Sequence, residues 1–107
     1  MPAWNELVIY ETHIGTFHRS DEDSVGTFAD YIAKFDHLKQ LGVNALQVMP
    51  IVEFAGDLSW GYNPAHPYAI EMAYGGAEGF KTFVREAAQG RTPSSWTSFT
   101  TTSALVI

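Results

Sequence analysis

Hydrophobic and polar positions follow two different periods along the first 90 residues of the chain. Residues 7–14 are rich in Val, Ile, Tyr and Thr and stop at Gly15, which predicts a β-strand. Thr27 and Asp30 match a capping box, and the apolar positions after them recur at spacings of three and four as far as Gly42. This pattern predicts one amphipathic helix, whose apolar positions are Phe28, Tyr31, Ile32, Phe35, Leu38 and Leu41.

A second strand and a second helix follow. Residues 43–51 are apolar almost throughout, as expected of a parallel strand covered on both faces. Residues 53–76 predict a long loop rich in Gly, Pro and aromatic residues, and residues 77–88 predict a helix with Phe80, Phe83, Val84 and Ala87 on one face. The order is that of an α/β protein with right-handed crossovers. Two parallel strands leave unpaired edges, so the pattern requires more strands than it supplies.

Composition narrows the expected partners. The 107 residues carry 12 Asp and Glu against 6 Lys and Arg, a formal charge of −6, which disfavours nucleic acid and anionic membrane surfaces. No segment is apolar for long enough to span a bilayer, and the first ten residues lack the basic start of a signal peptide. The absence of cysteine excludes disulfides and thiolate metal sites. We therefore expect a cytoplasmic protein, whose 46% hydrophobic content suffices for a packed core.

An aromatic segment from Phe54 to Tyr68 holds the candidate binding residues. It follows the carboxyl end of a predicted parallel strand, which is where α/β proteins place their ligands. Trp60, Tyr62 and Tyr68 offer flat apolar faces with polar handles, which suit sugar rings. The alternative is that these side chains only pack the loop onto the rest of the domain.

Several linked motifs resemble the start of the catalytic barrel of the α-amylase family of glycoside hydrolases. They are Tyr10–Phe17 (YETHIGTF), Leu41–Pro50 (LGVNALQVMP), Trp60–Pro64 (WGYNP), and Tyr74–Gly76 with Phe80 and Lys81. Within that family the motifs are most similar to glycogen branching enzymes and maltooligosyltrehalose trehalohydrolases. The resemblance covers about residues 7–90 and implies a partial (β/α)₈ barrel, made of its first two βα units.

The resemblance implies retaining chemistry on α-glucans, with a carboxylate nucleophile and a carboxylic acid that protonates the glycosidic oxygen. In the family these carboxylates follow later strands, so no catalytic residue is expected in this chain, and no cofactor or metal is expected either. Tyr62 matches the tyrosine that stacks on the glucosyl unit being cleaved, and Asn63 lies beside it. Trp60 is a weaker candidate for the same groove.

Other polar residues have competing interpretations. Glu11 and His13 alternate along the first strand, so they could form an acid/base pair or two metal ligands, but a structural hydrogen-bonding role is favoured. Glu53 is interpreted as a solvated rim charge. The acidic run at residues 21–23 is interpreted as a solvated loop, although carboxylates in this region bind calcium in some relatives. His37 and Lys39 are expected on the outer side of the first helix.

The last segment, residues 91–107, differs in composition from everything before it. It holds nine Ser and Thr, no carboxylate and no clear helical or strand period. A family member would continue into a third strand ending in a motif like Leu-Asp-Val-Val-Tyr-Asn-His-Phe-Gly-Pro. Reading the codons of Ser95 to Leu105 from each third base permits that motif, and Trp96 forces its Asp. We therefore hypothesise that residues 1–90 are barrel and that residues 91–107 are out-of-frame translation, which removes the motif's His.

Three functions remain open at this point. In the first, the chain is a fragment of an α-glucan-acting enzyme, and it is inactive alone because a complete barrel needs about 250 residues. Alternatively, it is a small non-catalytic glucan-binding module that uses Trp60, Tyr62 and Tyr68. The third reading is a non-functional truncated product that is degraded. Cooperative thermal unfolding would favour the binding module over the other two.

Overall fold

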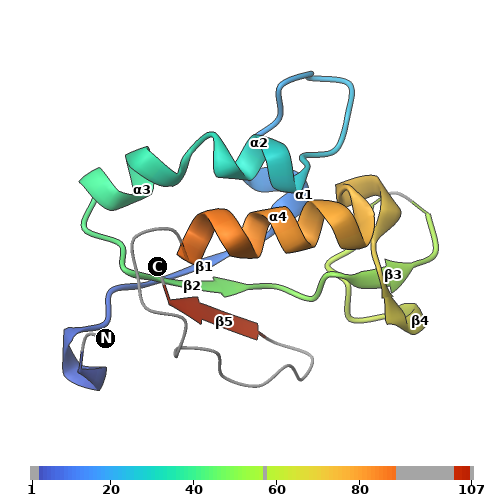
Figure 1. The fold of residues 1–107 in the computed structure, drawn as a ribbon. Helices are drawn as coiled ribbons and strands as arrows, with labels where there is room; N and C mark the ends of the chain where they lie inside the picture. Colours follow the sequence, from blue (N-terminus) through green and yellow to red (C-terminus); the bar gives the residue numbers. More distant parts are fainter. Residues whose placement is uncertain (1–2, 57, 89–102, 107) are drawn as a thin grey trace.

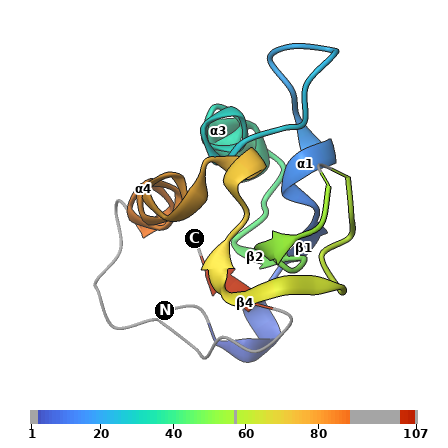
Figure 2. The same cartoon turned by 90° about the vertical axis from the view of Figure 1, so that its right-hand side faces the viewer.

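Three helices lie on one side of a small sheet (Figure 1). The computed structural model describes residues 3–56, 58–88 and 103–106. The sheet contains β1 (Ile9–Thr12), β2 (Ala45–Val48) and β5 (Ser103–Val106), in the order β1-β2-β5. The helices are α2 (Phe28–Ile32), α3 (Phe35–Gln40) and α4 (Gly76–Ala88), and α3 and α4 lie side by side when viewed along the layer (Figure 2). The chain therefore has the predicted α/β class, and its described elements form two layers.

The two predicted strands pair in parallel, but both are shorter than expected. Their register runs from Ile9 opposite Ala45 to Thr12 opposite Val48. The first strand ends early because the His13 carbonyl accepts a hydrogen bond from the Phe17 amide at 3.1 Å, which begins the short helix α1 (Ile14–Phe17). β2 is buried at three of its four positions, as expected of a strand covered by helices.

The predicted single helix after Thr27 is interrupted, which corrects the sequence interpretation. Its capping box is present, because the Asp30 amide donates to Thr27 Oγ1 at 3.2 Å and the Thr27 amide donates to Asp30 Oδ2 at 2.9 Å. At Lys34 the backbone leaves helical geometry, with φ −106° and ψ 3°, and its amide donates to Tyr31 three residues back. A tightened turn of this kind separates α2 from α3. Four of the predicted apolar positions are buried, Ile32 is partly buried, and Leu41 is exposed.

The segment predicted as a loop from residue 53 to residue 76 contains a two-stranded antiparallel sheet. β3 (Val52–Phe54) pairs with β4 (Pro64–Ile70), and a 3-10 turn, η2 (Met72–Tyr74), leads into α4. β4 was not predicted because it contains two prolines and pairs irregularly with β3. Proline has no backbone N–H and cannot donate a hydrogen bond to a neighbouring strand, so it argues against a strand in the sequence. The small sheet lies beyond the carboxyl ends of β1 and β2 (Figure 1).

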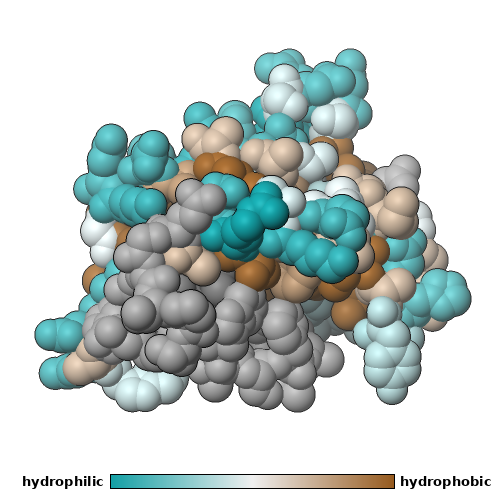
Figure 3. Space-filling model, viewed as in Figure 1, coloured by the Kyte–Doolittle hydropathy of each residue, from teal (hydrophilic) through white to brown (hydrophobic). Residues whose placement is uncertain are grey.

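An aromatic cluster joins the helices. Phe83 of α4 inserts among Phe28, Tyr31 and Phe35, with ring centroids 5.4 to 5.5 Å apart. Phe83, Phe28 and Tyr31 are each at most 1% exposed. This packing explains why the interrupted helix stays in place, because aromatic burial supplies more stabilisation than the lost backbone bonds. Polar side chains cover much of the outer surface of the helical layer (Figure 3).

β5 is a strand in a segment where the sequence shows no clear strand period. It pairs with β2 in antiparallel register, from Ala45 opposite Val106 to Val48 opposite Ser103. The third strand of a (β/α)₈ barrel would run parallel to the second. β5 therefore covers the edge of β2 with the opposite direction, and it leaves β1 at the outer edge of the sheet.

Candidate functional site

A backbone hydrogen bond joins the carboxyl ends of β1 and β2 next to the segment that carries Trp60 and Tyr62. The Met49 amide, just after β2, donates to the Thr12 carbonyl at the end of β1 at 2.8 Å. His13 and Pro50 are the next residues on the two strands. Both contact the segment around Gly61, so the sheet itself positions this segment.

Gly61 is wedged against Pro50. It is buried and has a φ of +87°, which L side chains rarely adopt. A Cβ atom at this position would lie 2.4 Å from the Pro50 carbonyl oxygen and 2.9 Å from Pro50 Cβ. Only glycine fits this close approach, and the contact fixes the height of the loop above the end of β2.

His13 fixes the same loop from the side of β1. Its Nε2 lies 2.8 Å from the Ser59 carbonyl oxygen and 3.0 Å from the Tyr74 hydroxyl, and its Nδ1 lies 3.1 Å from Thr16 Oγ1. The Ser59 carbonyl can only accept, so Nε2 must carry a hydrogen, and in a neutral ring Nδ1 then accepts from the Thr16 hydroxyl. The favoured prediction of a structural hydrogen-bonding role for His13 is confirmed.

The Ser59 side chain closes the loop on itself. The Gly61 amide donates to Ser59 Oγ at 3.0 Å, and the Ser59 hydroxyl donates to Asn63 Oδ1 in a short hydrogen bond. The Asn63 carbonyl oxygen is therefore engaged within the loop. The side-chain amide nitrogen of Asn63, Nδ2, makes no hydrogen bond among the described residues. It is therefore the Asn63 group that is open to a ligand.

Two of the three predicted aromatic residues, Trp60 and Tyr62, lie directly before and after the buried Gly61, and both side chains are exposed. Trp60 is 74% exposed and Tyr62 is 55% exposed. Tyr68 lies on β4 and is fully exposed. The alternative that Trp60 and Tyr68 pack the loop onto the domain is wrong for these residues, because neither ring is covered. We call Trp60 and Tyr62 the aromatic platform, and residues 59–63, which carry it, the platform loop.

Tyr74 lies beneath the platform loop and is buried. Its ring meets the His13 ring edge to face, with centroids 5.8 Å apart. Burial raises the pKa of Tyr74 to about 12, and the nearby Glu71 carboxylate adds to that pKa shift. Gly15 leaves room for both rings, since a Cβ there would lie 3.0 Å from Tyr74 Cε1 and 3.1 Å from His13 Cε1.

Glu71 is a buried carboxylate that the sequence interpretation missed. It is 3% exposed, and it accepts from the Phe54 amide at 3.1 Å and from the Ala73 amide at 2.9 Å. These bonds tie β3 to η2, and thereby hold Tyr74 under the loop. The sequence carried one signal for it, because Glu71 is the single acid in the apolar stretch of residues 69–73. An acid in such a stretch is buried only if hydrogen-bond partners surround its carboxylate.

The remaining polar candidates are dispersed. Glu11 is exposed on β1 and makes no hydrogen bond to His13. Glu53 is half-buried and accepts from the Met72 amide at 3.0 Å, a bond that the interpretation as a rim charge did not include. The acidic run at residues 21–23 is exposed, as are His37 and Lys39, as predicted. Among the described residues no three His, Asp or Glu side chains are grouped to hold a metal ion. None of the described helices is long and apolar enough to cross a bilayer.

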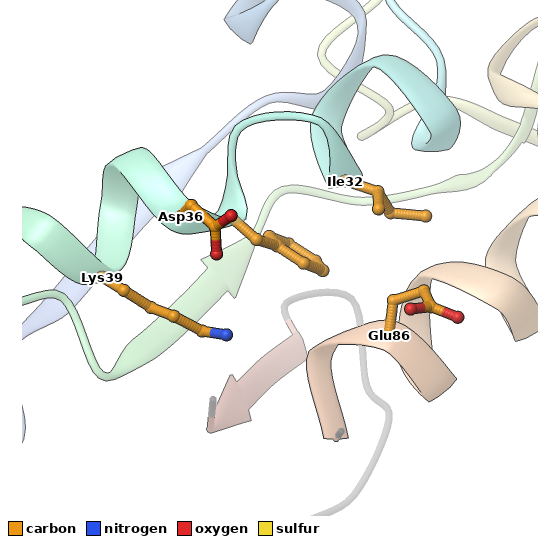
Figure 4. A pocket seen from close by; sticks show the side chains of 5 residues that line it. Ile32, Asp36, Lys39 and Glu86 are labelled. Atoms are coloured by element: carbon orange, nitrogen blue, oxygen red, sulfur yellow. The ribbon is translucent and has the colours of Figure 1, made fainter. Parts of the chain in front are cut away.

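A shallow pocket lies on the helical layer, away from the platform (Figure 4). Ile32 and Phe35 give it apolar walls, and Asp36, Lys39 and Glu86 stand at its rim. The pocket is formed between α2, α3 and α4 and contains none of the predicted site residues. The candidate site is therefore the platform loop.

A family model and several known proteins match most of this chain. The family model described as the catalytic domain of alpha amylase matches residues 11–91. The chain is 49% identical over 82 residues to malto-oligosyltrehalose trehalohydrolase of Saccharolobus solfataricus, covering 77% of this chain and 14% of that protein. It is 39% identical over 87 residues to a 1,4-alpha-glucan branching enzyme of Pseudoalteromonas atlantica, covering 78% of this chain and 12% of that protein.

A solved structure gives the same result. Isomaltulose synthase from Klebsiella sp. superposes with a TM-score of 0.69 at 31% identity, covering 79% of this chain and 15% of that chain. The present chain thus spans less than a sixth of each of these relatives. The matched region begins within β1 and contains β2, α4 and the whole platform loop. The chain belongs to the alpha-amylase catalytic domain family.

Proposed function

We propose that this chain is part of a catalytic domain that acts on α-glucans by a retaining mechanism, and that the aromatic platform binds the glucan. The activity is hydrolysis or the branching and transfer of α-1,4-glucan segments. Tyr62 stacks on a glucosyl ring, Trp60 extends the apolar surface, and the Asn63 amide nitrogen donates to a sugar hydroxyl.

One observation carries this proposal. The Gly61 wedge and the His13 bond hold two uncovered aromatic rings at the carboxyl ends of parallel strands. Neighbouring exposed aromatic rings mark a ligand or partner site more often than isolated ones do, and the carboxyl ends of strands are where (β/α)₈ barrels place their substrates. The family match over residues 11–91 and the similarity to a malto-oligosyltrehalose trehalohydrolase and a 1,4-alpha-glucan branching enzyme support glucan as the ligand class.

The chain by itself is proposed to bind without turnover. Retaining hydrolysis needs two carboxyl groups about 5 to 5.5 Å apart on either side of the scissile bond. Near the platform, Glu71 is buried in bonds to backbone amides, and Glu53 accepts from the Met72 amide. Neither has the freedom that a nucleophile or a proton donor requires, so the platform contributes only to substrate binding.

Titration of the purified chain with maltoheptaose tests the binding proposal. Isothermal calorimetry should detect binding, and Tyr62→Ala should weaken it about tenfold, because truncation removes the apolar face that covers the sugar ring. Trp60→Ala should also weaken binding. Cello-oligosaccharides, which carry β linkages, should bind more weakly than maltoheptaose.

Trp4 provides a matched control for the loss of an exposed tryptophan. It is 86% exposed and lies in η1 (Trp4–Glu6), at the amino end of β1 and opposite the platform (Figure 1). Trp4→Ala should leave the affinity for maltoheptaose unchanged. Equal affinities of wild type, Tyr62→Ala and Trp60→Ala would refute the platform assignment. Release of reducing sugar by the chain alone would refute the proposed lack of turnover.

A small glucan-binding module is the second candidate, and one observation favours it. The described residues include a buried aromatic cluster, and β5 covers the edge of β2. Both features help a short chain to fold without further strands. A single cooperative thermal transition with sugar binding would favour the module; a broad transition with exposed apolar surface would favour the fragment or the degraded product.

The out-of-frame origin of residues 91–107 also stays a proposal. It is supported by the sharp change in composition and by the third-strand motif that the possible codons permit in the shifted frame. Most of this segment lies outside the described residues, and the family match ends at residue 91. The antiparallel direction of β5 agrees with a segment that is not the family's third strand.

A further inference from the structure

The platform has two anchors on the sheet, and they differ in kind. The Gly61 contact with Pro50 is steric, and it sets how closely the loop approaches β2. The His13 contact is a hydrogen bond of 2.8 Å from the ring Nε2 to the backbone carbonyl of Ser59, the residue directly before Trp60. A hydrogen bond sets direction as well as distance.

The His13 ring is itself held on three sides. Thr16 Oγ1 lies 3.1 Å from Nδ1, the Tyr74 hydroxyl lies 3.0 Å from Nε2, and the Tyr74 ring packs on the imidazole edge to face. Tyr74 is 1% exposed and is held in turn by the η2 turn that Glu71 caps. The ring therefore has one orientation, and that orientation points Nε2 at Ser59.

We propose that His13 is a positioning residue for the glucan platform: its Nε2–H, bonded to the Ser59 carbonyl, sets the orientation in which Trp60 and Tyr62 meet the sugar. The inference rests on the proposed function, because it assigns the residue that orients the proposed binding surface. His13 touches no sugar in this arrangement. It acts through the backbone of Ser59. The Thr16 hydroxyl, donating to Nδ1, favours the Nε2–H tautomer, and the Tyr74 ring holds the imidazole by packing against it.

Two substitutions separate the hydrogen bond from the volume of the ring. His13→Leu keeps an apolar side chain of similar size but has no donor, whereas His13→Gln keeps a nitrogen donor that reaches the position of Nε2. His13→Leu should raise the hydrogen-exchange rate of the Gly61 amide about tenfold, because the loop that protects this amide opens more often. It should weaken maltoheptaose binding by about the same factor. His13→Gln should restore both.

Phe83→Leu serves as the control for general destabilisation. Phe83 lies in the aromatic core and makes no contact with the platform loop in any of its ring pairs. This variant should lower the unfolding midpoint and leave both the Gly61 exchange rate, measured well below that midpoint, and the sugar affinity unchanged. Nitrogen-15 NMR should show the His13 ring of the wild type in the Nε2–H tautomer.

The outcomes distinguish this inference from the proposed function. If wild type binds no maltoheptaose but His13→Leu speeds Gly61 exchange and His13→Gln restores it, the proposed function fails and the anchoring role stands. If wild type binds and His13→Leu changes neither exchange nor affinity, the inference is overturned. An Nδ1–H tautomer, or failure of His13→Gln to restore what His13→Leu loses, would overturn it as well.

Discussion

Gly61→Ala is the most informative single substitution in the platform loop. Two penalties act together at this position. The first is the backbone conformation, because a φ of +87° costs an alanine about 1 to 2 kcal/mol relative to glycine. The second is steric, because the new Cβ would lie 2.4 Å from the Pro50 carbonyl oxygen, and that oxygen belongs to backbone that cannot swing aside.

The chain can relieve the clash only by lifting the loop off Pro50. That movement would break the hydrogen bond from His13 to Ser59, which contributes on the order of 1 kcal/mol. The total loss in the free energy of unfolding should therefore be about 2 to 3 kcal/mol. Lifting the loop also turns Trp60 and Tyr62 away from their observed orientation, so glucan affinity should fall more than about tenfold.

Gly56→Ala is the matched control. Gly56 lies in the same connection with a φ of +80°, but nothing lies within 4 Å of the Cβ that alanine would add. It carries the backbone penalty of about 1 to 2 kcal/mol without the clash. Urea unfolding of both variants, followed by maltoheptaose titration, isolates the contribution of the Pro50 contact. Equal losses of stability and of affinity in the two variants would refute the wedge.

Three further predictions concern other parts of the chain. Gly15→Ala should lower stability by about 1 to 2 kcal/mol in urea unfolding, because its Cβ would lie 3.0 Å from the Tyr74 ring, and an unchanged midpoint would contradict the packing described here. Burial raises the pKa of Tyr31 and of Tyr74 to about 12, so the folded state holds these protons more tightly than the unfolded state, where the value is about 10. The stabilisation from these two groups should be complete below pH 10 and fall as the pH rises towards 12. Tyr31→Phe should reduce this loss in urea unfolding over that pH range, and an unchanged loss would contradict the role of Tyr31. Sequencing the coding DNA across residues 88–107 should show that a one-base correction restores the third-strand motif, and an uncorrectable frame would end the out-of-frame hypothesis.

The local sequence accounts for the elements whose signals lie within a few residues. The capping box of Thr27 and Asp30, the apolar face of α4 and the parallel strands β1 and β2 were all predictable, because each depends on local propensity and period. The interruption at Lys34 was not predictable. The helix breaks there while Phe28, Tyr31 and Phe35 still reach Phe83, and that choice depends on a partner helix some fifty residues away along the chain.

The candidate site divides in the same way. The sequence by itself determined which residues are the candidates for binding, because the WGYNP motif and its place after an apolar strand point to Trp60, Tyr62 and Asn63. Only the tertiary structure decided how they are presented. The Pro50 contact with Gly61 and the His13 bond to Ser59 join residues 11 and 46 positions apart, and no periodicity in a single sequence encodes such pairs. The buried Glu71 is the same case, because its partners are backbone amides that only the folded chain brings together.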